Sequence, residues 1–198
     1  MQQYLQATDI INWQHPAVLA KAQELAAGLA NKTEIARLCF EFVRDQIRHS
    51  WDFRQNPVTC KASDVLEQGT GYCYAKSHLL AALLRANGIP AGLCYQRLSA
   101  GESGPPYCLH GLNVVWLEGH GWYRIDPRGN KPGVDAQFCP PTEQLAFRLQ
   151  SAEEVDLPEI WPEPLAVVVQ VLTSCATVEE VRKNLPDIEL LSAVEHTF

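Results

Sequence analysis

The sequence lacks a long hydrophobic run, a dense basic run and a recognisable leader. Its longest apolar stretch, residues 165–172, is interrupted by Gln170 and is far too short to span a bilayer. The first residues, MQQYLQATDIINW, have neither a basic start nor a continuous apolar segment, so they do not resemble a secretory signal peptide. We therefore expect a cytoplasmic protein that has no membrane partner.

Basic residues are in the minority. The chain has 16 Lys and Arg against 23 Asp and Glu, a net charge of −7. Nucleic-acid binding needs a basic face, so nucleic acid is excluded as an expected partner. No D-x-D-x-D-G calcium loop is present, and no two of the seven cysteines have C-x-x-C spacing. We expect no metal and no cofactor, and reduced thiols.

What the sequence does contain is typical of one globular domain. The 198 residues are 46% hydrophobic and 20% charged, with no internal repeat. Apolar spacing and capping residues predict helices at 17–30, 33–47 and 73–87, with one helical turn at 64–67. Residues 165–173 are ambiguous between strand and helix, and we favour a helix. A capping box of Thr177 and Glu180 predicts a short last helix.

Alternating side chains predict strands at 91–98, 108–117 and 122–126, the last two as an antiparallel hairpin. Residues 49–59 and 128–141 read as irregular. Helices followed by an antiparallel sheet give an α+β fold.

Cys73 is the strongest candidate for a nucleophile. It follows Gly69 and Gly71 and begins a predicted helix, where exposed N–H groups and aligned dipoles favour a thiolate. Its own N–H is then free to donate to an oxyanion. The alternative is a small buried hydrophobic residue, which is how many free cysteines behave.

A cysteine nucleophile also needs a base. His78 lies about 140° around the helix from Cys73, so we expect it at the surface. The histidines at 15, 49, 120 and 196 fall in predicted loops, turns or the tail. His110 lies inside a strand on an otherwise apolar face, either as a core histidine or as the base.

Asp126, at the end of the next strand, is either a turn carboxylate or the group that orients His110. A register with Trp116 opposite Trp122 places Asp126 opposite Leu112 and diagonal to His110, within reach of the imidazole. An odd register would exclude Asp126.

Three blocks carry a family resemblance: GTGYCYAKSHLLAALLRANGIPAG, LHGLNVVWL and GWYRIDPRGN. Together they resemble the transglutaminase-like superfamily of bacterial cysteine enzymes. The resemblance implies a papain-like or transglutaminase-like core, with the catalytic cysteine at the start of a helix packed on an antiparallel sheet. It implies a triad of Cys73, His110 and Asp126, within one domain whose catalytic core spans about 33–130, with helical flanks at 1–32 and 142–198. Gln68 and Trp51 are the candidates for the second oxyanion donor.

The expected reaction is cleavage of a peptide or amide bond through a thioester on Cys73. We favour hydrolysis over transamidation, because this short chain has little length with which to build a water-excluding amine tunnel. The alternatives are a protein-glutamine transglutaminase, an acyltransferase like the arylamine N-acetyltransferases, and a binding module that has lost its chemistry. The oligomeric state is not predicted.

Overall fold

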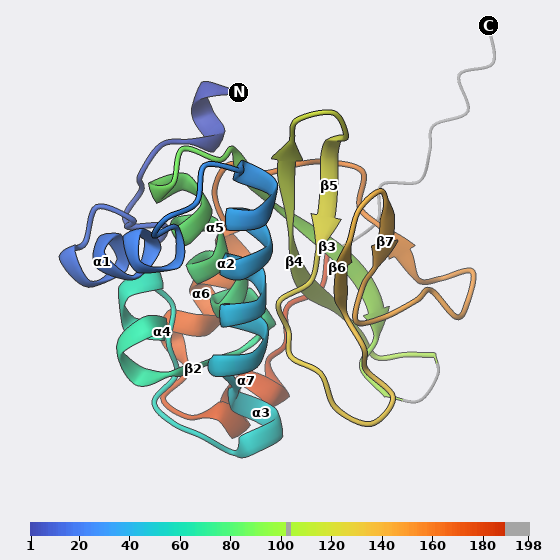
Figure 1. Cartoon of the computed structure of the whole chain (residues 1–198). Helices are drawn as coiled ribbons and strands as arrows, with labels where there is room; N and C mark the ends of the chain where they lie inside the picture. The colour runs from blue at the N-terminus through green and yellow to red at the C-terminus, as the bar shows by residue number, and fades with distance from the viewer. Residues whose placement is uncertain (102–103, 189–198) are drawn as a thin grey trace, which may run out of the picture.

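The computed structural model describes residues 1–101 and 104–188. Helices form one layer and an antiparallel sheet forms the other (Figure 1), which confirms the expected α+β class. The helices are η1 (Gln2–Tyr4), α1 (Pro16–Leu25), α2 (Lys32–Gln46), α3 (Ser50–Phe53), α4 (Ala62–Gln68), α5 (Cys73–Ala86), α6 (Ala166–Ser174) and α7 (Val178–Lys183). The strands are β1 (Arg48–His49), β2 (Thr70–Gly71), β3 (Ala91–Ser99), β4 (Tyr107–Leu117), β5 (Gly121–Ile125), β6 (Gln137–Cys139), β7 (Thr142–Gln144) and β8 (Val155–Asp156).

The main sheet has the strand order β5-β4-β3-β8, and every neighbouring pair is antiparallel. In the β4–β5 hairpin Trp116 lies opposite Trp122, so the predicted register is confirmed. Even pairing sums keep the side chains of His110 and Asp126 on one face of the hairpin. The register therefore determines whether the two residues can meet.

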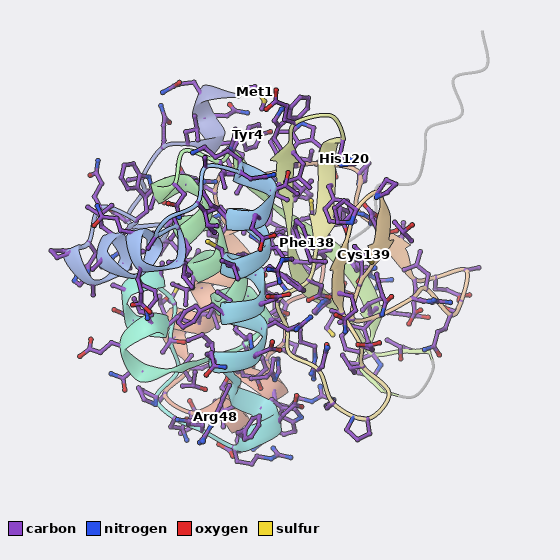
Figure 2. All side chains as sticks on the ribbon, viewed as in Figure 1. Met1, Tyr4, Arg48, His120, Phe138 and Cys139 are labelled. Atoms are coloured by element: carbon purple, nitrogen blue, oxygen red, sulfur yellow. The ribbon has the colours of Figure 1, made fainter. Side chains whose placement is uncertain are left out.

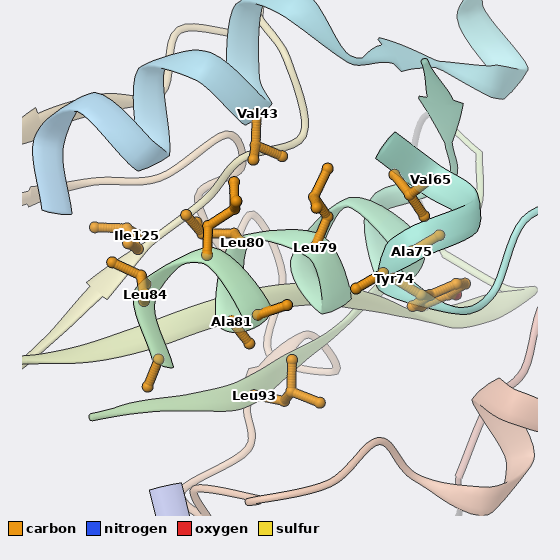
Figure 3. Packing of buried hydrophobic residues seen from close by; sticks show 14 of the residues in the cluster. Val43, Val65, Tyr74, Ala75, Leu79, Leu80, Ala81, Leu84, Leu93 and Ile125 are labelled. Carbon is orange, nitrogen blue, oxygen red and sulfur yellow. The ribbon is translucent and has the colours of Figure 1, made fainter. Parts of the chain in front are cut away.

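Helix α5 is the centre of the molecule. Every residue from Cys73 to Arg85 is buried. Figure 3 shows its leucines between Val43 of α2, Val65 of α4 and the strands that carry Leu93 and Ile125. A helix that is apolar around most of its circumference belongs in a core. Burying each leucine stabilises the fold by about 1.5–3 kcal/mol, so α5 holds Cys73 on a rigid support.

His78 is not at the surface, and that expectation is wrong. Its side chain is 1% exposed, and its Nδ1 lies 2.8 Å from the carbonyl oxygen of Cys60, to which it donates as the neutral ring. Because α5 is covered on all sides, the angle around its axis does not separate buried from exposed positions. Burial lowers the pKa of His78 to about 4, although the hydrogen bond to Cys60 opposes the shift.

This buried histidine predicts acid sensitivity. A histidine whose folded-state pKa lies below its unfolded value of about 6.5 loses stability as pH falls from 6.5 towards the folded value. Between pH 6.5 and 4.5, His78 should cost about 2–3 kcal/mol of unfolding free energy. His78→Asn keeps an N–H donor but cannot titrate. The difference in unfolding free energy between wild type and variant should therefore shrink by about 2–3 kcal/mol as pH falls from 6.5 to 4.5. Urea unfolding at several pH values measures it, and parallel pH curves for the two proteins would contradict it.

Several segments that read as irregular contain short strands or helices. Residues 48–49 pair in parallel with 70–71, and α3 follows directly. Residues 137–139 pair with 142–144 around Pro140 and Pro141. These two- and three-residue ladders depend on a partner segment elsewhere in the chain. They are too short to show an alternating pattern that would predict them. The C-terminal flank is helical only in α6 and α7, because β7 and β8 also lie in it; residues 189–198 are outside the described part of the chain.

The ambiguous segment at 165–173 is helical, as favoured, and lies in α6 (Ala166–Ser174) after the N-cap residue Leu165. Thr177 caps α7 by accepting from the backbone N–H of Glu180. The first helix ends at Leu25 rather than near residue 30, because the chain turns through Gly28 at φ 74°. Among the described residues no helix combines the length and hydropathy needed to cross a bilayer.

Gly111 on β4 permits the close approach of α5. A Cβ at this position would lie 2.9 Å from Cδ1 and 3.2 Å from Cα of Tyr74, the residue that follows Cys73. Gly111→Ala should therefore lower the unfolding free energy by about 1–3 kcal/mol through overpacking. Gly101→Ala is the matched control, because its added methyl would meet nothing within 4 Å. Equal denaturation midpoints for the two variants would contradict this interpretation.

Candidate functional site

The turn before α5 fixes the position of Cys73. Gly71 pairs with His49, and a Cβ on Gly71 would lie 3.0 Å from the Cβ of Ala75, so only glycine fits without displacement. Tyr72 is the N-cap residue, and its hydroxyl donates to the carbonyl oxygen of Val178 at 2.9 Å. Cys73 is thus the first helical residue, with 7% of its surface exposed.

At this position the backbone N–H of Cys73 has no acceptor within the helix. The first N–H groups of a helix have no intrahelical acceptor, and they point out from the positive end of the helix dipole. The Cys73 carbonyl, in contrast, is bonded into the helix and accepts from the Ser77 hydroxyl at 2.9 Å. The amide of Cys73 can therefore donate to an oxygen that gains negative charge next to its own thiol.

His110 and Asp126 meet behind the thiol. The Nε2 of His110 lies 2.7 Å from Oδ2 of Asp126, and the carboxylate is fully buried. Asp126 also accepts from the backbone N–H groups of Arg128 and Ala146, each at 3.1 Å. Burial alone would raise the pKa of Asp126, but His110 and these donors outweigh it and lower the pKa. The carboxylate is therefore held ionised and aimed at the ring.

The protonation of His110 responds to both neighbours. Burial lowers its pKa, but the charges and hydrogen bonds of Asp126 and Cys73 outweigh burial and raise the pKa above 6.5. Since Nε2 faces Asp126, Nδ1 is the ring nitrogen left for Cys73. Phe147 packs edge-on against the imidazole, with centroids 4.9 Å apart and planes at 89°. The ring is thus fixed between a carboxylate, an aromatic and a thiol.

A cleft of about 490 Å³ opens over these groups. Its walls come from α3, α5, α7, the ends of β3 and β4, and the segments 128–131 and 147–154. Cys73 and His110 line the cleft, while Asp126 lies behind His110. The arrangement can support nucleophilic attack by a thiol on a carbonyl carbon, with proton transfer by an imidazole.

The two candidates for the second oxyanion donor lie in different places. Trp51, on α3, lines the cleft. Gln68 is exposed at the C-terminal end of α4 and is not part of the cleft lining. The structure therefore brings Trp51, and not Gln68, into the same space as Cys73.

A second group of polar residues lies beside the site and was not among the predicted site residues. His49 is 6% exposed, lines the cleft and packs edge-on against Tyr72 at 5.4 Å. Burial, followed by the charge of Arg128, keeps its pKa well below 6.5, so it is neutral near pH 7. Arg128 donates two hydrogen bonds, of 2.7 and 3.1 Å, to the carboxylate of Asp52. The block GWYRIDPRGN contains Arg128 two residues after Asp126, and this is the signal that could have pointed to it.

The other histidines that the structure describes lie outside the site, and the described residues contain no group of metal ligands. His15 and His120 are outside the cleft lining, and His196 lies beyond the described residues. Over residues 1–101 and 104–188, no three His, Cys, Asp or Glu side chains group as metal ligands.

One family model and several solved structures match this chain. The model of the transglutaminase-like superfamily matches residues 19–127, more than half of the chain. No curated protein matches. A structure from Cytophaga hutchinsonii, described as a candidate cysteine protease, is similar with a TM-score of 0.51 and 16% identity, over 63% of this chain and 40% of that one. The periplasmic domain of TgpA from Pseudomonas aeruginosa gives a TM-score of 0.48 and 23% identity, over 63% and 45% of the two chains. This chain thus spans less than half the length of either.

Proposed function

The chain belongs to the transglutaminase-like superfamily, and on this premise we propose that it is a cysteine hydrolase of peptide or side-chain amide bonds. One observation carries the proposal. Cys73 begins a buried helix and faces a cleft together with His110, whose ring is held by Asp126 at 2.7 Å. Nucleophile, base and orienting carboxylate are the three parts that cysteine-dependent acyl transfer needs.

Acylation would begin with transfer of the Cys73 proton to Nδ1 of His110. The thiolate attacks the amide carbonyl carbon, and the oxygen gains negative charge that the Cys73 N–H stabilises. The C–N bond then breaks, and the leaving nitrogen takes the proton from His110. A thioester and a free amine result. Asp126 stabilises the imidazolium between the two transfers without accepting its proton.

Deacylation reverses the roles with water in place of the amine. His110 takes a proton from water, the hydroxide oxygen attacks the thioester carbon, and the C–S bond breaks. Products are a carboxylic acid and the restored Cys73. Exposed polar residues, Arg148 and Gln150, lie on the cleft wall, so water has direct access to the acyl group. This access favours hydrolysis over transfer to an amine acceptor.

Partition of the acyl-enzyme tests the reaction. An activated acyl donor is supplied with and without a primary amine at about 10 mM, with Cys73→Ala as the blank. We expect free acid to exceed amide by at least about fivefold, because water is present at far higher concentration and reaches the acyl group through the open cleft. If amide dominates at this concentration, the hydrolase assignment is wrong and the transglutaminase alternative holds.

A further inference from the structure

The charge of the cleft is opposite to that of the protein. The whole chain carries a net charge of −7, with 23 acidic against 16 basic residues. The cleft, however, is lined by four cationic side chains, Arg128, Lys131, Arg148 and Arg182, and by one carboxylate, Glu154. A cluster of cations in a hollow concentrates anions there, and the low-dielectric walls strengthen the field.

Part of this positive charge is used within the protein. Asp52 accepts two hydrogen bonds from Arg128 and one from Lys131 at 2.6 Å, so a single carboxylate serves two cations. Glu154 does not pair with a cation among the described residues. Its two oxygens accept from the backbone N–H groups of Ser99 at 2.9 Å and Gln150 at 2.6 Å. Over residues 1–101 and 104–188, the cleft lining therefore keeps an excess of positive charge.

Arg182 and Arg148 supply that excess. Arg182, on α7, donates to the carbonyl oxygen of Ala100 at 2.7 Å, and its guanidinium lies over the ring of Trp51 at 5.6 Å. Within residues 1–101 and 104–188 neither Arg182 nor Arg148 has a carboxylate partner. Stacking and the carbonyl bond hold Arg182 in place while leaving its other N–H groups available.

From this arrangement we propose that the substrate is anionic: a peptide or amide that carries carboxylates close to the bond attacked by Cys73, bound by Arg182 and Arg148. The inference deepens the proposed function and rests on it. A guanidinium recognises a carboxylate through paired N–H donors, and holding it beside an aromatic ring lowers the entropy lost on binding. Arg128, already bonded to Asp52, serves to support the site.

A first test reads the field of the cleft without any turnover. Iodoacetate and iodoacetamide alkylate thiolates in the same way but differ by one negative charge. The exposed Cys139 on the β6–β7 hairpin (Figure 2) is outside the cleft lining and serves as an internal reference. We expect the iodoacetate to iodoacetamide rate ratio at Cys73, divided by that at Cys139, to fall about threefold in Arg182→Gln/Arg148→Gln. Mass spectrometry of the two cysteine peptides measures it.

Two variants control this experiment. Lys183→Gln removes one positive charge from the same helix, α7, at an exposed position outside the cleft, and should leave the ratio unchanged. Arg182→Lys keeps the positive charge at this position, so this variant should show much of the wild-type rate ratio. The effect of the double substitution should also shrink in 0.5 M salt, where the Debye length is only a few ångströms. A ratio in the double glutamine variant equal to that of Lys183→Gln overturns the inference.

A second test uses substrates. Two peptides that differ only by Asp against Asn next to the scissile bond are compared by kcat/KM. We expect the Asp peptide to be preferred about tenfold, and the preference to fall to about twofold in the double glutamine variant. Cleavage of both peptides with no preference overturns the anionic-substrate inference and leaves the hydrolase proposal standing. Absence of any Cys73-dependent cleavage or acylation, with the alkylation effect present, overturns the hydrolase proposal instead.

Discussion

Cys73→Ala should reduce turnover by at least about 10⁴-fold, because the thioester forms on the Cys73 thiol, which lies beside His110. Only the amide N–H and the binding cleft would remain, and these do not form a thioester. The substitution removes one sulfur atom from a side chain that is 7% exposed, so the unfolding free energy should change by about 1 kcal/mol or less. Initial rates and urea unfolding of the same preparation measure both effects.

Cys60 offers a contrasting control. It is buried and its pKa is raised to about 11, mainly by burial, so it is not a thiolate near neutral pH. Cys60→Ala should keep the specific activity of the folded fraction while lowering stability. Turnover that survives in Cys73→Ala and disappears in Cys60→Ala would overturn the assignment of the nucleophile.

Asp126→Asn should lower kcat by about 10²- to 10⁴-fold. A neutral amide cannot stabilise the imidazolium that forms during both proton transfers. Only Cys73 then opposes the lowering of the His110 pKa by burial. The amide NH₂ would replace either Oδ2, which accepts from His110 and Ala146, or Oδ1, which accepts from Arg128. Either placement leaves a buried donor without an acceptor, at a cost of about 1–3 kcal/mol. Steady-state kinetics and thermal unfolding check the two parts.

The pH dependence of the unfolding free energy measures the coupling between Asp126 and His110. The pKa of Asp126 is lowered, so its contribution is present above about pH 4 and is lost as pH falls through the folded value. The pKa of His110 is raised, so its contribution is complete below about pH 6.5 and is lost as pH rises through the folded value. The pair should thus contribute most between these limits, and Asp126→Asn should remove this maximum.

Asp9→Asn is the matched control, because Asp9 is exposed and the same isosteric change there should alter neither kcat nor the pH profile. An Asp126→Asn protein with wild-type kcat would remove Asp126 from the mechanism, whatever happens to its stability.

Features that depend on local pattern were predictable. The glycine pair and the Gly88 stop located α5 within one residue. Period-two alternation required an even register for His110 and Asp126 to share a face, and the Trp116–Trp122 pairing is one such register. From that register the meeting of His110 and Asp126 followed by geometry alone. These features could be predicted because each depends on the pattern of neighbouring residues along the chain.

Features that depend on tertiary packing were not predictable. His49 lies beside the cleft because of a two-residue ladder with 70–71, which leaves no trace in the sequence. His78 is buried because helices cover α5 on the side away from the sheet, which its own periodicity does not reveal. The positive cleft combines residues from α7 and two loops far apart in the chain, in a protein that is acidic overall.

The most direct test of the account is the site of acylation. The protein is mixed with an activated ester of an acidic dipeptide, quenched in acid within the first turnover and mapped by mass spectrometry. We expect one acyl group, on Cys73, that disappears in Cys73→Ala and accumulates in Asp126→Asn if deacylation is slowed more than acylation. An acyl group on the exposed Cys139, or the same labelling in Cys73→Ala, would contradict it.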